Sequence, residues 1–222
     1  MVENGTTACA WDTVIPFAPL WEAYKRIIKP NGAIVLFGSE PFASYLRLSN
    51  IAGYKYDWSW NKHRAGNFFA AGKRPLNVHE NILIFGQEST VFNSQMWQGE
   101  PYSVKQNNDG SQIGAYGKQK RQGITQNDGA RHPISCLSFG TPANNGKLHP
   151  TQKPVPLLEF LIRTYTNTGE TVLDSCFGSG TTAIACMRTG RKFIGIERDD
   201  AYFKICVERV RDEQQQGRLF TL

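Results

Sequence analysis

The sequence lacks the long apolar run that a membrane span needs. No apolar stretch approaches the roughly 20 residues of a transmembrane helix, and the N-terminus shows no signal peptide. The five cysteines, Cys9, Cys136, Cys176, Cys186 and Cys206, form no CxxC pair and no Cys/His cluster with metal-ligand spacing. These absences argue against a membrane protein, a zinc site and a disulfide framework, and they favour reduced, buried thiols in a cytoplasmic protein.

The composition is that of an ordinary globular chain with a basic excess. The 222 residues are 40% hydrophobic and 20% charged. This length is sufficient for one sizeable core, so we expect a single domain over residues 1–222 with an elaborated insert. The formal net charge of +6 and the pI near 9.1 favour a polyanionic partner without proving one.

A glycine loop lies in the last quarter of the chain, within "LDSCFGSGTTAIA" at Leu173–Ala185. The segment predicts a buried strand, a tight turn at Gly178 and Gly180, and a helix that begins on a threonine pair suited to capping. The next apolar run, Phe193–Ile196, predicts a second strand that ends at Glu197. A carboxylate about 20 residues after the glycines is placed to bind a ribose diol, although a purely structural turn also explains the loop.

The rest of a sheet built around this loop lies upstream, because only 25 residues follow Glu197. An amphipathic helix is predicted at Leu20–Lys29, and Ala33–Phe37 is a continuous apolar run typical of a buried parallel strand. The segments "YKYDWSWNK" and "VHENILIFGQ" predict two longer strands, joined by the basic link "HRAGNFFAAGKRPLN". The second half of the sheet therefore precedes the first, as in a circular permutation.

Residues 87–148 form an insert of different composition, rich in Asn, Gln, Gly and basic residues. It is too long for an ordinary connection. Its composition fits both a disordered loop and a surface that reads base edges and phosphates. The order of the surrounding parts favours a recognition surface.

The late glycine loop, the preceding "HPTQKPVPLLEFLIRTYTNTGETVLD" and the upstream half-sheet resemble the β-class amino DNA methyltransferases over nearly the whole chain. These enzymes transfer a methyl group from S-adenosyl-L-methionine to adenine N6 or cytosine N4. The resemblance implies an α/β, Rossmann-like methyltransferase fold, circularly permuted, with a mostly parallel sheet, helices on both faces and a polar insert. Adenine is favoured as the target on family frequency alone.

The resemblance also implies a cofactor site. Glu197 is expected to bind the ribose hydroxyls, Lys153 to offer a cation to the cofactor carboxylate, and Asp174 to order the loop near the cofactor amine. A rigid turn before a helix at Val155–Thr166 explains the Lys153 segment as well, and simple helix capping is the alternative for Asp174. The expected cofactor-binding residues are Asp174, Phe177, Gly178, Ser179, Gly180, Thr181, Glu197, Thr151, Gln152, Lys153 and Ser39.

The partner implied by the resemblance is double-stranded DNA, from which the family's enzymes extrude the target base. Phe68 and Phe69 lie among the basic residues of the link, and we expect part of this pair to be core. His79 beside Glu80 resembles an acid/base pair, yet a hydrogen-bonded strand-end histidine is the favoured interpretation. No metal is needed, and the sequence leaves a homodimer open. The expected DNA-binding residues are Lys62, His63, Arg64, Lys73, Arg74, Lys118, Lys120 and Arg121.

The sequence departs from the family at the catalytic motif, an Asp/Asn/Ser-Pro-Pro-aromatic run expected immediately before Gly5. Met1–Asn4 stand there instead, and the sequence has no Pro-Pro pair. We therefore expect an N-terminally shortened enzyme of weak activity. A catalytically inactive DNA- or cofactor-binding remnant is the alternative, while the basic insert disfavours a small-molecule methyltransferase.

Overall fold

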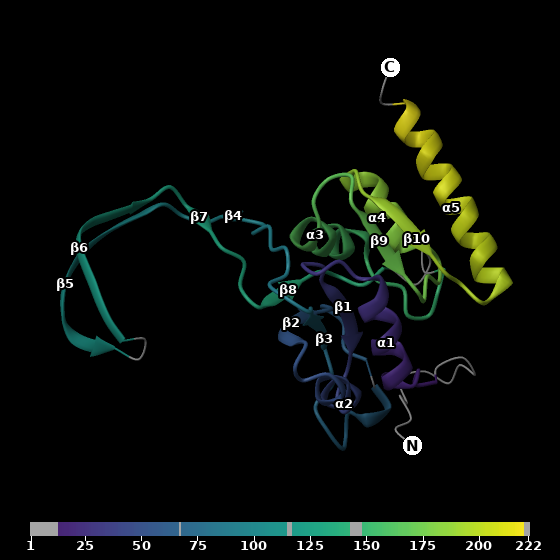
Figure 1. The fold of residues 1–222 in the computed structure, drawn as a ribbon, viewed down its shortest axis with the longest axis horizontal. Coiled ribbons are helices and arrows are strands. Elements are labelled where there is room, and N and C mark those ends of the chain that lie inside the picture. The colour runs from purple at the N-terminus through teal and green to yellow at the C-terminus, as the bar shows by residue number, and fades with distance from the viewer. Residues whose placement is uncertain (1–12, 67, 115–116, 143–147, 220–222) are drawn as a thin grey trace. The chain divides into compact units, whose positions relative to one another are not determined.

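The computed structural model describes residues 13–66, 68–114, 117–142 and 148–219 (Figure 1). The chain divides into two compact units, one formed by residues 94–134 and the other by the residues before and after them. Each unit is described by itself. Within the described residues, no helix combines the length and the apolarity needed to cross a membrane.

The larger unit begins with three strands and two helices. The elements are α1 (Phe17–Ile27), β1 (Ile34–Gly38), α2 (Phe42–Ser49), β2 (Tyr54–Asn61), the 3₁₀ turn η1 (Phe68–Ala70) and β3 (His79–Phe85). The chain returns to this unit with β8 (Cys136–Ser138), α3 (Val155–Tyr165), β9 (Thr171–Asp174), α4 (Thr181–Thr189), β10 (Lys192–Gly195) and α5 (Asp200–Leu219). The helices and strands predicted around the glycine loop are therefore confirmed to within a few residues.

The first sheet has the strand order β1-β3-β2-β8. Strand β3 is antiparallel to both β1 and β2, and β8 is parallel to β2. The prediction that Ala33–Phe37 lies beside parallel strands is wrong, because β1 pairs with β3 through Leu36 and Leu83 in antiparallel register. A strand buried on both faces is a continuous apolar run in either orientation, so its sequence reports burial and not direction.

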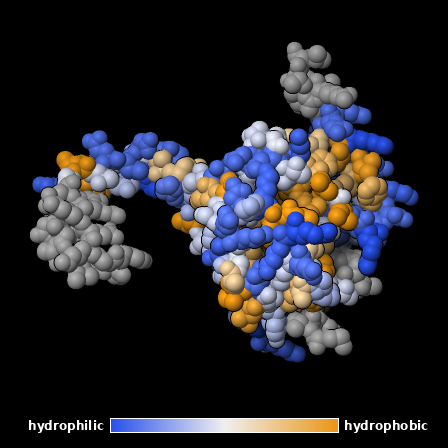
Figure 2. Space-filling model, in the orientation of Figure 1, coloured by the Kyte–Doolittle hydropathy of each residue, from blue (hydrophilic) through white to orange (hydrophobic). Residues whose placement is uncertain are grey.

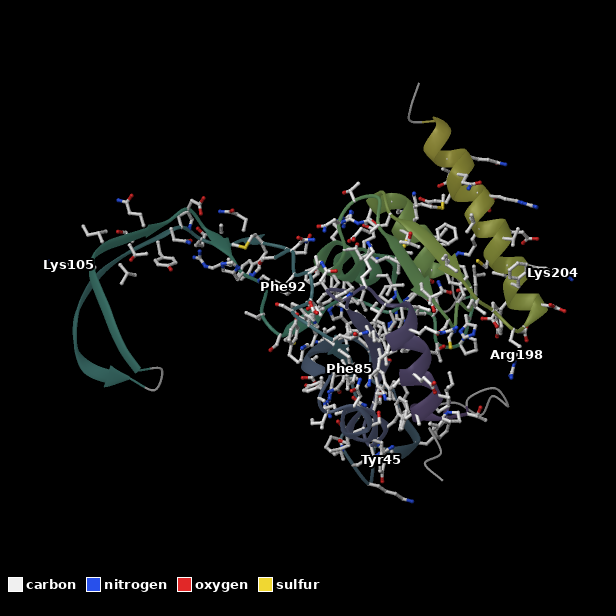
Figure 3. The ribbon with its side chains drawn as sticks, in the orientation of Figure 1. Tyr45, Phe85, Phe92, Lys105, Arg198 and Lys204 are labelled. Atoms are coloured by element: carbon white, nitrogen blue, oxygen red, sulfur yellow. The ribbon has the colours of Figure 1, made fainter. Side chains whose placement is uncertain are left out.

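Helices cover both faces of this sheet. On one face, Ile82 and Ile84 of β3 pack with residues of α3, and on the other face, Leu83 and Phe85 pack with residues of α1 and α2. All four β3 side chains are fully buried, and Phe85 is labelled in Figure 3. Strand β3 therefore lies at the centre of the core that the first sheet forms with its helices.

The second sheet is the parallel pair β9 and β10, with Asp174 opposite Gly195 in register. Val172 and Phe193 face α4, which joins the two strands. Side chains of α1 and of the connection after it reach this half, because Tyr24 Oη lies 3.0 Å from Ser175 Oγ and Lys29 Nζ donates to Glu170 Oε1 at 2.8 Å. The larger unit thus brings the glycine loop beside the helix that precedes β1.

The smaller unit consists of antiparallel strands. It contains β4 (Trp97–Gln98), β5 (Tyr102–Gly114), β6 (Gly117–Asn127) and β7 (Ala130–Arg131), with β5 paired to β6 and β4 to β7. Its side chains are described for residues 94–105 and 123–134; Lys105 of β5 is labelled in Figure 3. Figure 2 shows apolar residues interspersed with hydrophilic ones over one face of the molecule, as is usual for protein surfaces.

Candidate functional site

The loop between β9 and α4 turns through two glycines with positive φ. Gly178 has φ +50° and Gly180 has φ +73°, a backbone region that residues with a Cβ rarely adopt. Gly180 N donates to Phe177 O at 2.9 Å and closes the turn. A Cβ at Gly180 would lie 2.5 Å from Cys206 Sγ on α5. The loop is therefore tightly packed, and it delivers the N-terminus of α4, the positive end of a helix dipole, to the edge of the sheet.

Asp174 ends β9 and fixes both sides of this loop. Its carboxylate accepts a hydrogen bond from Cys176 N at 3.0 Å and another from Thr182 Oγ1 at 2.6 Å. Burial, followed by the nearby Asp174 carboxylate, raises the pKa of the Cys176 thiol. The cysteine of the loop therefore stays protonated at neutral pH and is a poor nucleophile.

Glu197 follows β10 and lies against the glycine loop. One carboxylate oxygen accepts from Gly178 N at 2.6 Å, and the other accepts from Asp199 N at 2.8 Å. A carboxylate oxygen has two lone pairs, so each of these atoms keeps capacity for a further donor. The geometry leaves Glu197 able to accept from a pair of hydroxyl groups while it holds the loop.

Phe177, Ser179 and Thr181 of the same segment are buried. The Phe177 ring stacks on Phe193 with centroids 6.0 Å apart, so its side chain belongs to the core and only its backbone faces the loop. Ser179 and Thr181 are buried as well, and the Arg209 guanidinium bonds to Ser179 O and to Ser179 Oγ at 3.2 Å. Burial lowers the pKa of Arg209. Sequence reasoning missed Arg209, because nothing near it in the chain indicates a contact 30 residues away.

The segment "HPTQKP" forms a turn beside the glycine loop. The His149 ring would be 3.4 Å from a Cβ at Gly178, and it packs edge-on against Tyr202 with centroids 4.3 Å apart. Thr151 Oγ1 lies 3.1 Å from His149 Nδ1, and Gln152 Oε1 accepts from Leu148 N at 2.8 Å. The hydroxyl and amide groups predicted to meet the cofactor thus also stabilise their own turn.

Lys153 is half-buried and paired with Glu80, which lies near the start of β3. Its Nζ is 3.0 Å from Glu80 Oε1 and 4.9 Å from the centre of the Phe37 ring. Lys62 Nζ is 3.9 Å from the other oxygen of the same carboxylate. Sequence reasoning considered Glu80 only as a partner of His79, and it missed this ion pair. Ser39 lies just beyond β1, where its backbone oxygen accepts from Ala43 N at 2.9 Å.

The predicted DNA-binding residues of the link lie at the ends of β2 and η1. Lys62 is half-buried, whereas His63, Arg64, Lys73 and Arg74 are exposed. His63 has φ +62°, and its Nε2 lies 2.6 Å from Ser138 Oγ. The structure therefore gathers these basic residues on one connection.

The expectation that part of the Phe68–Phe69 pair is core is wrong. Phe68 is 69% exposed and Phe69 is fully exposed. The reason is local, because the link forms the short turn η1 in place of a continued hairpin, and its rings therefore do not alternate onto the core face. Two aromatic side chains thus stand in solvent among cations.

The side chains of the remaining predicted site residues are not described by the structure. Lys118, Lys120 and Arg121 are backbone positions of β6 in the smaller unit, but their side chains are not among those described. Met1–Asn4, at the position expected for the catalytic motif, also lie outside the described residues. Over the described part of the chain, no group of three or more His, Cys, Asp or Glu side chains is arranged to hold a metal ion.

Comparisons with known proteins agree with this arrangement. The model of the N6/N4 DNA methylase family matches residues 11–208. The crystal structure of the M1.HpyAVI–SAM complex superposes with a TM-score of 0.60 at 27% identity, covering 88% of this chain and 85% of that one. The PvuII DNA methyltransferase, described as cytosine-N4-specific, shares the fold with a TM-score of 0.57 at 18% identity, covering 89% of this chain and 75% of that one.

A curated relative matches part of the chain more closely. The type II methyltransferase M2.DpnII of Streptococcus pneumoniae is 46% identical over 67 residues, which are 30% of this chain and 25% of the relative. The match thus spans about a quarter of that relative's length. Together with the solved structures, these findings confirm the predicted Rossmann-like α/β fold. Because the family model covers most of the sequence, the chain belongs to the N6/N4 DNA methylase family.

Proposed function

We propose that this chain is a site-specific DNA methyltransferase that moves a methyl group from S-adenosyl-L-methionine to an exocyclic amine of a base in duplex DNA, with adenine N6 favoured over cytosine N4. The observation that carries the proposal is the glycine loop, which Glu197 holds through Gly178 N at 2.6 Å beside the His149 turn. A structural relative, M1.HpyAVI, was solved with the same cofactor. We further propose a cytoplasmic enzyme that protects DNA in a restriction–modification pair.

The proposed cofactor pose follows from the donors and acceptors of the loop. Glu197 accepts from the two ribose hydroxyls, and the α4 N-terminus faces the polar part of the ligand. Asp174 keeps the loop in the required conformation through Cys176 N and Thr182 Oγ1. Thr151 and Gln152 close the methionine side.

Lys153 is proposed to bind the carboxylate of the cofactor with Glu80 as its support. An ammonium group has three N–H donors. The partners described for Lys153 Nζ are Glu80 Oε1 at 3.0 Å and Thr151 O at 3.5 Å, and these use two of the donors. The third is available for a ligand carboxylate. In this pose Glu80 fixes the direction of the ammonium group, and the Phe37 ring limits its movement.

The proposed reaction is a direct transfer of the methyl group to the exocyclic amine. A cofactor held by Glu197 and Lys153 would supply the methyl group of its sulfonium to the exocyclic nitrogen, the electron pair of the carbon–sulfur bond would stay on sulfur, and the amine proton would pass to solvent. The alternative is a non-catalytic protein that binds the cofactor and DNA.

The DNA side of the proposal uses two basic regions of a single methyltransferase domain. The link residues His63, Arg64, Lys73 and Arg74, together with Lys62 just before the link, contact phosphates near the cofactor edge of the sheet. The insert 87–148 contains the strands β5 and β6 with Lys118, Lys120 and Arg121, and it reads the target sequence. An antiparallel two-stranded ribbon fits the major groove in width.

Two measurements test the proposed function. Calorimetry with S-adenosyl-L-methionine tests the cofactor site, and transfer of a tritiated methyl group to unmethylated genomic DNA tests the reaction. We expect cofactor binding together with label in the DNA. Cofactor binding without transfer supports the non-catalytic alternative, and the absence of cofactor binding contradicts the proposal as a whole.

A further inference from the structure

Phe68 and Phe69 expose two aromatic rings on the link between β2 and β3. Phe68 is 69% exposed, and Phe69 is fully exposed. Large apolar side chains exposed side by side frequently mark an interaction site. The residues around them select the kind of partner.

Backbone hydrogen bonds join the ends of the link and close the turn at Phe68. Lys62 N donates to Val78 O at 2.8 Å, and Gly66 N donates to Asn77 O at 3.0 Å, so the two ends of the link are bonded to each other. Ala71 N donates to Phe68 O at 3.1 Å and closes the turn η1. The ends of the link are therefore joined by hydrogen bonds, and Phe68 opens a hydrogen-bonded turn.

Sheet register places the link at the edge where the proposed cofactor site lies. Gly38, at the end of β1, pairs with Asn81, while Asn61, at the end of β2, pairs with His79. The link thus leaves the sheet at the carboxyl edge of β1. Glu80, two residues after the link, bonds to Lys153 of the turn that closes the proposed pocket.

The ionisable side chains of the link are all basic. Residues 62–78 contain Lys62, His63, Arg64, Lys73 and Arg74 and no Asp or Glu. Cations that flank exposed aromatic rings are the combination that nucleic acids select, because phosphates meet the charges and bases meet the rings. A partner with an acidic surface and no bases would leave the rings unused.

We propose that Phe68 and Phe69 form an aromatic wedge that enters the DNA duplex and stacks on the bases beside the position vacated by the extruded target base. This inference rests on the proposed function, and it names how the enzyme handles its substrate. Extruding a base removes stacking from both of its neighbours, and apolar side chains that enter the gap restore it. Arg64, Lys73 and Arg74 hold the flanking phosphates while the rings insert.

The test compares two duplexes of the same sequence, one fully paired and one with a central abasic position. The abasic duplex offers the gap without requiring the recognition sequence. We expect the wild-type chain to bind it about tenfold more tightly, a preference within the range of aromatic–base stacking. The Phe68→Ala/Phe69→Ala variant should lose this preference and keep its affinity for the paired duplex. A 2-aminopurine base beside the gap should be quenched by the wild type and not by the variant.

Matched variants separate the rings from their surroundings. Leu48→Ala removes an apolar side chain that is 72% exposed on α2 and should leave the preference unchanged. Phe69→Trp should retain it, and Lys73→Ala/Arg74→Ala should weaken binding to both duplexes equally. Unchanged S-adenosyl-L-methionine affinity in every variant shows that the fold is intact, as expected for exposed positions.

The outcomes distinguish the wedge from the proposed function. If the wild type methylates DNA but binds both duplexes equally, or if the double alanine variant keeps the preference, the wedge is wrong and the proposed function stands. If the wild type binds neither S-adenosyl-L-methionine nor DNA, both proposals fail.

Discussion

Replacing Glu197 with alanine removes the acceptor that Gly178 N and Asp199 N share at 2.6 and 2.8 Å. In the proposed complex it also removes the acceptor of the ribose hydroxyls. A hydrogen bond to a charged acceptor contributes about 1.5 to 3 kcal/mol, and part of this is regained from water, so we expect a loss of about 1 to 3 kcal/mol. The Kd for S-adenosyl-L-methionine should therefore rise about 5- to 150-fold in calorimetry.

Two further variants make this result specific to Glu197. Glu197→Gln should be nearly as damaging, because each carboxylate oxygen accepts a backbone N–H and an amide has only one oxygen to offer. Glu208→Ala removes an exposed acid from α5 and controls for the change in net charge. An unchanged Kd in Glu197→Ala, with Glu208→Ala also unchanged, would refute the ribose assignment.

Three further predictions concern the loop, the link and the Lys153 pair. Gly180→Ala should lower the free energy of unfolding by about 1 to 3 kcal/mol in urea, because φ is +73° and a Cβ would meet Cys206 Sγ at 2.5 Å. The control Gly72→Ala, with open space around the residue, should change the free energy of unfolding by less than about 0.5 kcal/mol. DNA affinity should fall steeply between about 50 and 200 mM salt. Lys73→Ala/Arg74→Ala should flatten this salt dependence, and the control Lys204→Ala should leave it unchanged. An equal salt dependence in the wild type and both variants would place the phosphate contacts elsewhere. Glu80→Gln should weaken cofactor binding about five- to tenfold by releasing Lys153, and an affinity equal to that of wild type would show that Lys153 needs no support.

Local features of the site could be predicted from the sequence because their causes are local. Gly178 and Gly180 stand where the backbone needs positive φ, and Glu197 follows the next strand at a spacing that brings it to the loop. Asp174 and Thr182 are eight residues apart across one turn. These contacts span 19 and eight residues within one strand–loop–helix–strand unit, so spacing alone restricts their geometry.

Contacts between segments that are distant in the sequence could not be predicted from residue spacing. The Lys153–Glu80 pair joins α3's leading turn to β3, and the Arg209–Ser179 bond joins α5 to the loop. Only the three-dimensional packing decides these partners. The antiparallel pairing of β1 with β3 and the exposure of Phe69 were missed for a related reason, since an apolar residue in a sequence does not show which surface, if any, will cover it.

The bond from Arg209 to Ser179 makes the order of the glycine loop depend on the docking of α5. Cys206 fills the space beside Gly180, and Arg188 of α4 pairs with Glu213 at 2.6 Å, so α5 meets both the loop and the helix that follows it. Thermodynamic coupling is reciprocal: a ligand that favours this loop conformation must favour the docked helix by the same free energy. The last helix of the chain thus reports, through the protection of its amides from hydrogen exchange, whether the loop is occupied.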